Sequence, residues 1–355
     1  MKRIFVYLLL ITIFAGFLLL TNCNDKDKNG GDQEMIGWAA GESVGGFGTI
    51  LHTKDGGVTW ERQGDASMIP DTYLQDIRAV DKDVVWAVGE PEGELLVILK
   101  TEDGGKTWIR QGLENGLQDV SLSGICPVSR NVCWAAGYKG TILKTLDGGN
   151  NWTVIRASPG YMGRYQMIAA LDENHAWATG EGDTVAMIHY TSDGGLTWER
   201  QGTDSLTTGN MPNALIDIHA ENVNYVWAVG PSQAIYTLNG GKTWINKRTP
   251  IGFIHNNGVC IVNDQIVWVA TDNNLIFKLS QLNGDWNNQT SPAGALTAMY
   301  LGVTAIDENR AWMTSSSVTG AGQIINTVNG GATWVIQQIP EEVSLRRITF
   351  VGGKR

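Results

Sequence analysis

Short apolar runs alternate with clusters of glycine, aspartate and asparagine along most of this 355-residue chain. One copy of the pattern reads IRAV, VVWAVG, LVILKT and KTWIRQ, four pieces of strand length that are bounded by Asp, Gly, Asn or Pro. Such runs, rich in Val, Ile and Trp, predict β-strands. After the first twenty residues no long stretch repeats apolar residues with the period of a helix. The pattern therefore predicts an all-β protein.

The fourteen tryptophans divide into two sets of seven, and both sets follow one repeat. The first set follows a short apolar run: Trp38, Trp86, Trp134, Trp177, Trp227, Trp268 and Trp312. The second set closes a glycine turn: Trp60, Trp108, Trp152, Trp198, Trp244, Trp286 and Trp334. The spacing of about 46 residues is that of a propeller blade. Four short antiparallel strands make one blade, and blades must stack in a ring to bury their faces.

The two ends of the repeat region predict how the ring closes. The first copy begins at IGWAAG, its second strand, with no counterpart of IRAV before it. The chain finishes with LRRITFV, a first strand with nothing after it but a short tail. We therefore predict a monomeric seven-bladed β-propeller of four-stranded antiparallel blades over residues 36–355. Its C-terminal strand should complete the N-terminal blade.

A turn that reads TKDGGVTW at residues 53–60 recurs with small changes. Its central position is occupied by Asp55, Asp103, Asp147, Asp193, Asn239 and Asn329. An Asp or Asn side chain accepts hydrogen bonds from nearby backbone N–H groups, and the glycines adopt positive φ without strain. Asn cannot replace Asp as a general base or nucleophile, although two copies use it. The turn is therefore predicted to be structural, and no catalytic residue is assigned to it.

The N-terminus has the pattern of an export signal. Lys2 and Arg3 precede an uncharged apolar run that ends just before Cys23, and a polar, Gly-containing segment follows. The arrangement resembles a bacterial lipoprotein signal, although Asn22 replaces the usual small residue. We expect a signal peptide at 1–22, a lipid anchor on Cys23 and a polar tether at 23–35. An uncleaved signal-anchor helix and simple secretion are the alternatives. Each places the globular part outside the cytoplasm, in the cell envelope or beyond.

Charge and cysteine content exclude several classes of function. Without Lys2 and Arg3 the net charge falls from −10 to −12, which opposes nucleic-acid binding and broad adsorption to anionic lipid. Cys126 and Cys260 lie at equivalent repeat positions and are expected in the core, although a Cys126–Cys133 disulfide is an alternative. The five histidines have no metal-ligand spacing, so we expect no metal and no cofactor.

The fuller repeat, CWAAGYKGTILKTLDGGNNW, resembles the photosystem II stability and assembly factor family. The turn within it is the Asp-box, or bacterial neuraminidase repeat. The resemblance covers residues 36–355 and implies a seven-bladed propeller without known enzymatic activity. Members in photosynthetic organisms act as chaperone-like factors that bind reaction-centre subunits during assembly, and related chains also occur in bacteria without photosynthesis. The resemblance therefore implies a protein-binding scaffold and does not name its partner.

Recognition is expected on the face that carries the variable loops, because the Asp-box turns on the other face are nearly constant. One loop there combines residue types that are enriched at interfaces: Arg156, Tyr161, Met162, Arg164 and Tyr165. The family binds acidic or membrane-protein partners partly through an arginine-bearing face, which makes this loop the first candidate. A self-packed loop with solvated arginines is the alternative. Arg78, Arg346 and Arg347, on predicted innermost strands, are weaker candidates at the channel mouth.

An extracellular carbohydrate-active enzyme, or a glycan-binding protein, of the sialidase or glucanase Asp-box type is the alternative function. A glucanase needs two facing carboxylates, and four acidic residues lie in second-strand loops: Glu90, Glu92, Glu181 and Asp183. A sialidase needs an arginine triad, and the Arg-Ile-Pro motif usual near the N-terminus of sialidases is missing. Short loops leave little material for a sugar cleft. A non-enzymatic, envelope-anchored propeller that binds protein partners is therefore the preferred prediction.

Overall fold

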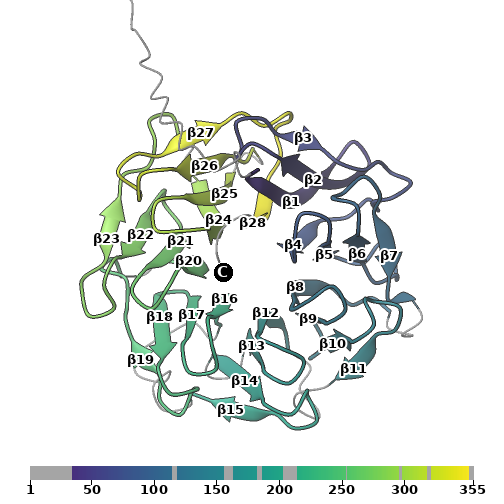
Figure 1. The fold of residues 1–355 in the computed structure, drawn as a ribbon, viewed down its shortest axis with the longest axis horizontal. Coiled ribbons are helices and arrows are strands. Elements are labelled where there is room, and N and C mark those ends of the chain that lie inside the picture. The colour runs from purple at the N-terminus through teal and green to yellow at the C-terminus, as the bar shows by residue number, and fades with distance from the viewer. Residues whose placement is uncertain are drawn as a thin grey trace, which may run out of the picture. The chain divides into compact units, whose positions relative to one another are not determined.

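Seven four-stranded antiparallel sheets are arranged as the blades of a ring around a central axis (Figure 1). The computed structural model describes residues 34–113, 118–155, 163–181, 186–202, 214–252, 254–295, 298–317 and 321–351. The described residues contain no α-helix, so none that is long and apolar enough to cross a membrane. The predicted all-β, seven-bladed fold is confirmed.

The first four blades follow the repeat, with strands named in order from the innermost to the outermost. Blade 1 consists of β28 (Leu345–Val351), β1 (Ile36–Val44), β2 (Phe47–Thr53) and β3 (Glu61–Arg62). Blade 2 consists of β4 (Leu74–Ala79), β5 (Val85–Gly89), β6 (Ile98–Thr101) and β7 (Ile109–Gln111). Blade 3 consists of β8 (Leu122–Pro127), β9 (Cys133–Gly137), β10 (Ile142–Thr145) and β11 (Thr153–Ile155). Blade 4 consists of β12 (Tyr165–Ala170), β13 (Ala176–Gly180), β14 (Met187–Thr191) and β15 (Glu199–Gln201).

The remaining three blades have the same strand order. Blade 5 consists of β16 (Asp217–Ala220), β17 (Val226–Gly230), β18 (Gln233–Thr237) and β19 (Ile245–Asn246). Blade 6 consists of β20 (Asn256–Ile261), β21 (Val267–Thr271), β22 (Ile276–Leu279) and β23 (Asn287–Gln289). Blade 7 consists of β24 (Ala298–Ala305), β25 (Ala311–Ser317), β26 (Ile324–Thr327) and β27 (Val335–Gln337).

The ring is closed by pairing between the two ends of the propeller. Strand β28 pairs antiparallel with β1, with Trp38 opposite Thr349. The side chain of Gln337, at the end of blade 7, donates a hydrogen bond to the carbonyl oxygen of Gly56 in blade 1 at 3.0 Å. The predicted closure, in which the C-terminal strand completes the N-terminal blade, is confirmed.

Tryptophans fill the spaces between neighbouring blades. The first set of seven is fully buried, each with 0% exposure. In four neighbouring blade pairs an indole of the first set meets the second-set indole of the next blade edge to face, as Trp86 meets Trp152 at 5.7 Å between ring centroids. Such edge-to-face pairs add to the large apolar area that tryptophan buries. The repeat thus encodes blade-to-blade contacts, which explains why each copy keeps both tryptophans.

The Asp-box turn is held by its own side chains. Asp193 Oδ1 accepts hydrogen bonds from the Thr191 hydroxyl at 2.8 Å and the Thr197 amide at 2.9 Å, and its Oδ2 accepts from the Thr197 hydroxyl at 2.6 Å. Asn239 keeps both contacts to its oxygen, while its amide nitrogen donates to the Thr243 hydroxyl at 2.9 Å. Since a threonine hydroxyl both donates and accepts, Asp and Asn serve the same turn. The geometry is structural.

Acid should weaken the contribution of the Asp193 turn to stability. Hydrogen bonds from Thr197 and Thr191 lower the pKa of Asp193 from 3.8 to about 2. A carboxylate with a depressed pKa stabilises the fold above its unfolded-state pKa and loses that effect as pH falls toward the folded-state value. We expect the stability of wild type relative to Asp193→Asn to decrease between pH 4 and pH 2. Urea unfolding of both proteins across that range measures it, and a pH-independent difference would contradict the expectation.

The three cysteines that the structure describes are thiols that form no disulfide. On the paired strands β8 and β9, Cys126 lies opposite Trp134 and Cys133 lies opposite Pro127. This one-residue offset places the two cysteines on opposite faces of the sheet, because side chains alternate along a strand. They accordingly belong to different core clusters. The alternative of a Cys126–Cys133 disulfide is therefore wrong in this structure. Cys260 is buried as expected, whereas Cys126, also expected in the core, is only partly buried, and Cys133 is buried.

The three N-terminal predictions lie wholly or mostly outside the described residues. The signal peptide, Cys23 and most of the tether belong to residues 1–33. The described chain begins beside the Asp-box turn of blade 1, where Met35 forms an isolated bridge with Asp55 and its carbonyl oxygen accepts from the Gly56 amide at 2.9 Å. The propeller is therefore joined to the preceding residues on its Asp-box face.

Candidate functional site at the channel mouth

A cavity of about 450 Å³ opens at the end of the central channel, opposite the Asp-box turns. It is lined by residues at the starts of innermost strands and in the loops after the second strands. From blades 1 and 2 these are Glu42, Tyr73, Ser344, Arg346 and Arg347. From blades 4 to 7 they are Arg164, Gln166, Glu181, Ala214, Ile216, His255, Asn257, Met299, Leu301 and Ser316. The variable-loop face therefore contains a mostly polar hollow at the axis of the ring.

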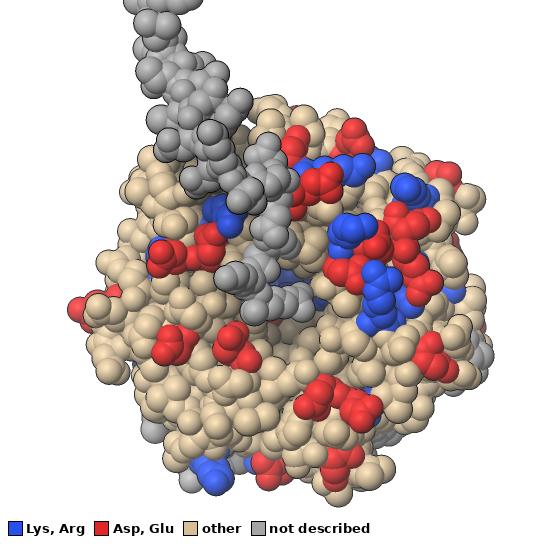
Figure 2. All heavy atoms as spheres, in the orientation of Figure 1, with Lys and Arg blue, Asp and Glu red and all other residues tan. Residues whose placement is uncertain are grey.

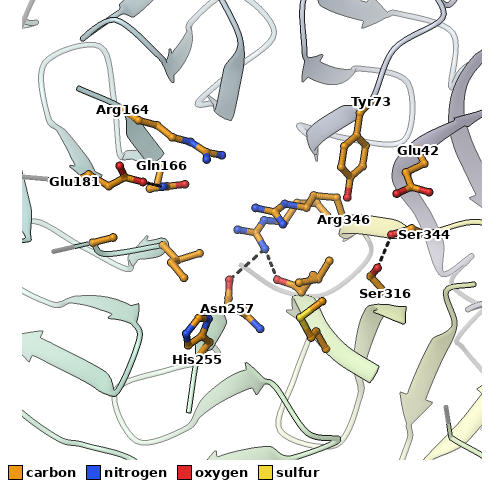
Figure 3. Close-up of a pocket in the computed structure, with 15 residues that line it drawn as sticks. Glu42, Tyr73, Arg164, Gln166, Glu181, His255, Asn257, Ser316, Ser344 and Arg346 are labelled. Atoms are coloured by element: carbon orange, nitrogen blue, oxygen red, sulfur yellow. Dashed lines mark hydrogen bonds between the residues drawn. The ribbon is translucent and has the colours of Figure 1, made fainter. Parts of the chain in front are cut away.

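Arg346 and Arg347 are carried by β28, the strand that closes the ring. The Arg347 side chain is only 4% exposed, and its Nη1 donates to the backbone carbonyl oxygens of Asn257, at 3.2 Å, and Leu301. Arg346 is partly exposed at the cavity wall. Figure 3 shows Tyr73 and Arg346 both pointing into the cavity, with the Tyr73 hydroxyl directed at the Arg346 side chain. The sequence placed both arginines on an innermost strand but could not give their direction.

Arg164 is the member of the predicted recognition loop that reaches this cavity. It precedes β12, and its guanidinium lies over the ring of Tyr138 at 4.6 Å from the centroid, with Nε donating to the Ser123 hydroxyl at 3.3 Å. Figure 3 shows the side chain extending into the cavity from the side of blade 4. Arg164 therefore bridges blades 3 and 4 while its head lines the channel mouth.

The other members of that loop divide into two groups. Arg156, Tyr161 and Met162 lie outside the described residues. Tyr165 is fully buried, and its hydroxyl is 2.7 Å from Nδ1 of His189. Burial lowers the pKa of His189 to about 4, which keeps that imidazole neutral at pH 7. Tyr165 is the first residue of β12, and its side chain points into the blade core. The prediction that Tyr165 forms part of an exposed contact surface is therefore wrong.

Arg78 is committed to an ion pair on its own strand. Its Nε lies 3.2 Å from Oδ1 of the fully buried Asp76, whose Oδ2 accepts from the Ile125 amide of the next blade at 3.0 Å. Burial opposes the charge on Arg78, but Asp76 and Asp217 outweigh it and raise the pKa of the guanidinium. Arg78 does not line the cavity. Its position indicates a role in joining blades within the channel.

The carboxylates considered for a glycosidase are held by neighbouring side chains. Glu90 accepts from Gln75 at 3.1 Å, Glu92 pairs with Arg110 at 2.7 Å, and Glu181 accepts from Gln166 at 2.6 Å. Asp183 lies outside the described residues. Within the described ranges, no group of three or more His, Cys, Asp or Glu side chains is arranged to hold a metal ion.

The face of the ring that Figure 2 shows has no large patch of basic side chains. There, acidic and basic side chains gather in mixed clusters on the side of the first blades, and mostly acidic residues are scattered elsewhere. Three arginines around one cavity are thus a local concentration in an acidic protein. Residues that the sequence analysis missed, such as Tyr73, Asn257 and Ser344, share only their position near the start of an innermost strand. In the sequence, only this position near the start of an innermost strand could have indicated that these residues line the cavity.

These features define a seven-bladed Asp-box propeller with a basic, polar hollow at one end of its channel. The family model described as "Photosynthesis system II assembly factor YCF48" matches residues 71–355. The chain belongs to this family, as the repeat motifs predicted.

Relatives of known name agree with this assignment. "Photosystem II assembly protein Ycf48" of Synechococcus sp. (strain JA-2-3B'a(2-13)) is 25% identical over 197 residues, which is 54% of each chain. The match thus spans about half the length of that curated relative. A structure titled "YCF48 bound to D1 peptide" is 21% identical with a TM-score of 0.59, over 77% of this chain and 84% of that one. YCF48 from Cyanidioschyzon merolae is 18% identical with a TM-score of 0.59, over 77% and 88%. These two structures support the fold.

Proposed function

We propose that this protein is a non-enzymatic, envelope-anchored propeller that binds a protein partner, as an assembly or stability factor. Membership of the YCF48 family supports the assembly role. The bound D1 peptide named for one similar structure supports a polypeptide as the ligand. The observation that carries the proposal is the cavity at the channel mouth, where Arg164, Arg346 and Tyr73 from three blades converge on the variable-loop face. Arginine and tyrosine are among the side chains most enriched at binding hot spots.

The attachment point of the N-terminal segment gives this surface an orientation. The described chain starts on the Asp-box face, beside Asp55, whereas the cavity opens on the other face. A lipid on Cys23 would be joined to Glu34 by a segment with a maximum reach of roughly 40 Å, at about 3.5 Å per residue. Such an anchor would hold the propeller by its Asp-box side.

Affinity capture from native envelope membranes tests the proposed binding. We expect wild type to recover a defined membrane complex, identified by mass spectrometry, and Arg164→Gln to recover it at least about tenfold less, the loss typical of a 1.4 kcal/mol contact. Arg130→Gln is the matched control, because Arg130 is an exposed arginine that pairs with Asp81 away from the cavity. Equal recovery by wild type and Arg164→Gln, with both folded by circular dichroism, would remove Arg164 from the binding surface. Recovery of no complex by wild type would contradict the proposed function.

A further inference from the structure

Arg347 is a buried cation without a carboxylate in direct contact. Among the described residues no Asp or Glu forms an ion pair with Arg346 or Arg347, although nine contacts between Lys or Arg and a carboxylate occur elsewhere. Nη1 of Arg347 bonds to two backbone carbonyl oxygens, and its buried Nε has no hydrogen-bond partner within the described structure. Burying a charged donor without full pairing costs free energy. This side chain therefore holds an unsatisfied positive charge against the cavity.

The side chains that line the cavity around Arg347 include more arginines than carboxylates. Arg164 and Arg346 also line the cavity, against the carboxylates of Glu42 and Glu181. One of those two, Glu181, already accepts from the amide of Gln166 at 2.6 Å. Asp217 attracts Arg347 through the channel, but its oxygens accept from the amides of Ile218 and Val259, at 3.0 and 2.9 Å.

Neutral donors complete the same wall. The Ser344 hydroxyl donates to the Ser316 hydroxyl at 2.7 Å, and both residues line the cavity together with Tyr73. Figure 3 shows Tyr73, Ser344 and Ser316 on the side of Arg346. Burial lowers the pKa of Arg347, and Arg346 and Arg78 add to this effect while Asp217 and Asp76 oppose it. An anion placed here would offset the cost of burying the charge and the repulsion between the arginines. A guanidinium offers paired N–H groups that match the two oxygens of a carboxylate or phosphate.

We propose that the channel mouth is an oxyanion-binding site in which Arg347 and Arg346 hold a carboxylate or phosphate group, with hydroxyl donors from Tyr73 and Ser316, since Ser316 accepts from Ser344 and keeps its own proton to donate. The cavity, at about 450 Å³, has room for such a group and part of the molecule that carries it. The group arrives either as a free small anion or on a larger ligand. The inference does not depend on the proposed protein-binding function, because isolated anions test it.

Isothermal titration calorimetry of the full chain in detergent tests the site with two probes, inorganic phosphate and succinate, at ionic strength matched with chloride. We expect saturable one-site binding of at least one probe. Arg346→Gln should weaken it at least about tenfold, because one of two adjacent cations is lost. Arg347→Lys keeps the charge but loses the planar fork, and should weaken binding by several fold. Arg130→Gln, outside the cavity, should bind as wild type does.

The possible results distinguish a free small anion from an anion carried by a larger ligand. They also include results that would overturn the proposal. A dissociation constant below about 1 mM for a free probe favours a free small anion as the natural ligand. Saturable but weaker binding, still lost in Arg346→Gln, favours an oxyanion carried by a larger ligand. Absence of saturable binding by both probes overturns the proposal. Equal binding by wild type, Arg346→Gln and Arg347→Lys also overturns it, whatever the membrane capture shows.

Discussion

Ending the chain after Ser344 is expected to abolish cooperative unfolding of the propeller. The truncation removes β28, the innermost strand of blade 1, and with it Leu345, Ile348 and Phe350, which are 0%, 2% and 6% exposed. Burying one such side chain stabilises a fold by about 1.5–3 kcal/mol. Three of them contribute roughly 5–9 kcal/mol, which is comparable to the whole stability of a typical domain, about 5–15 kcal/mol.

Near-ultraviolet circular dichroism during heating measures this effect. Wild type should give one sharp transition, whereas the truncated chain should give none or a broad one. A synthetic peptide of residues 344–355 added in trans is the control, because it can restore the missing strand. A truncated chain that unfolds as sharply and at the same temperature as wild type would show that ring closure by β28 does not hold the blades together.

Replacing Trp312 by alanine should cost about 3–5 kcal/mol of unfolding free energy, the usual effect of truncating a buried tryptophan. Trp312 is fully buried between blades 7 and 1. Its ring stacks on Phe350 with centroids 3.9 Å apart, and its Nε1 donates to the Gly56 carbonyl oxygen at 2.8 Å. The substitution therefore leaves a cavity and removes a hydrogen-bond donor at the closure of the ring.

Urea unfolding followed by far-ultraviolet circular dichroism measures the loss without relying on tryptophan fluorescence. Leu196→Ala is the control, since Leu196 is 87% exposed at the tip of an Asp-box turn and should change stability by less than about 0.5 kcal/mol. If Trp312→Ala destabilises the protein by no more than the control does, the tryptophans do not carry the contacts between blades.

The seven-bladed fold could be predicted because the same sequence motifs recur along the chain. Each copy carries its strands, its Asp-box turn and two tryptophans. Where the strand pattern of one copy is unclear, the equivalent positions of the other copies show where its strands begin and end. The incomplete first copy and the surplus strand at Leu345–Val351 then determined how the ring closes. Asp193 and Asn239 occupy the same position of the Asp-box turn in two different copies of the repeat. This variation predicted a structural role for the turn, and the hydrogen bonds that both side chains accept agree with that role.

The site was less accessible from sequence, because its residues come from distant parts of the chain. Arg164 and Tyr165 are adjacent, yet one lines the cavity and the other is buried in a blade. Their separation follows from the alternation of side chains at the start of β12, where the pairing with β13 shifts register after Tyr165. The incomplete pairing of Arg347 depends on which groups surround it in three dimensions, and no spacing along the chain reports that.

Site-specific photo-crosslinking in native membranes tests the central claim most directly. A photoreactive residue in place of Tyr73 lies at the channel mouth, and one in place of Leu196 lies at an Asp-box turn far from the cavity. If the variable-loop face binds the partner, position 73 should crosslink to one defined protein and position 196 should not. Crosslinking to a protein from position 196 alone, or from neither position, would contradict this account.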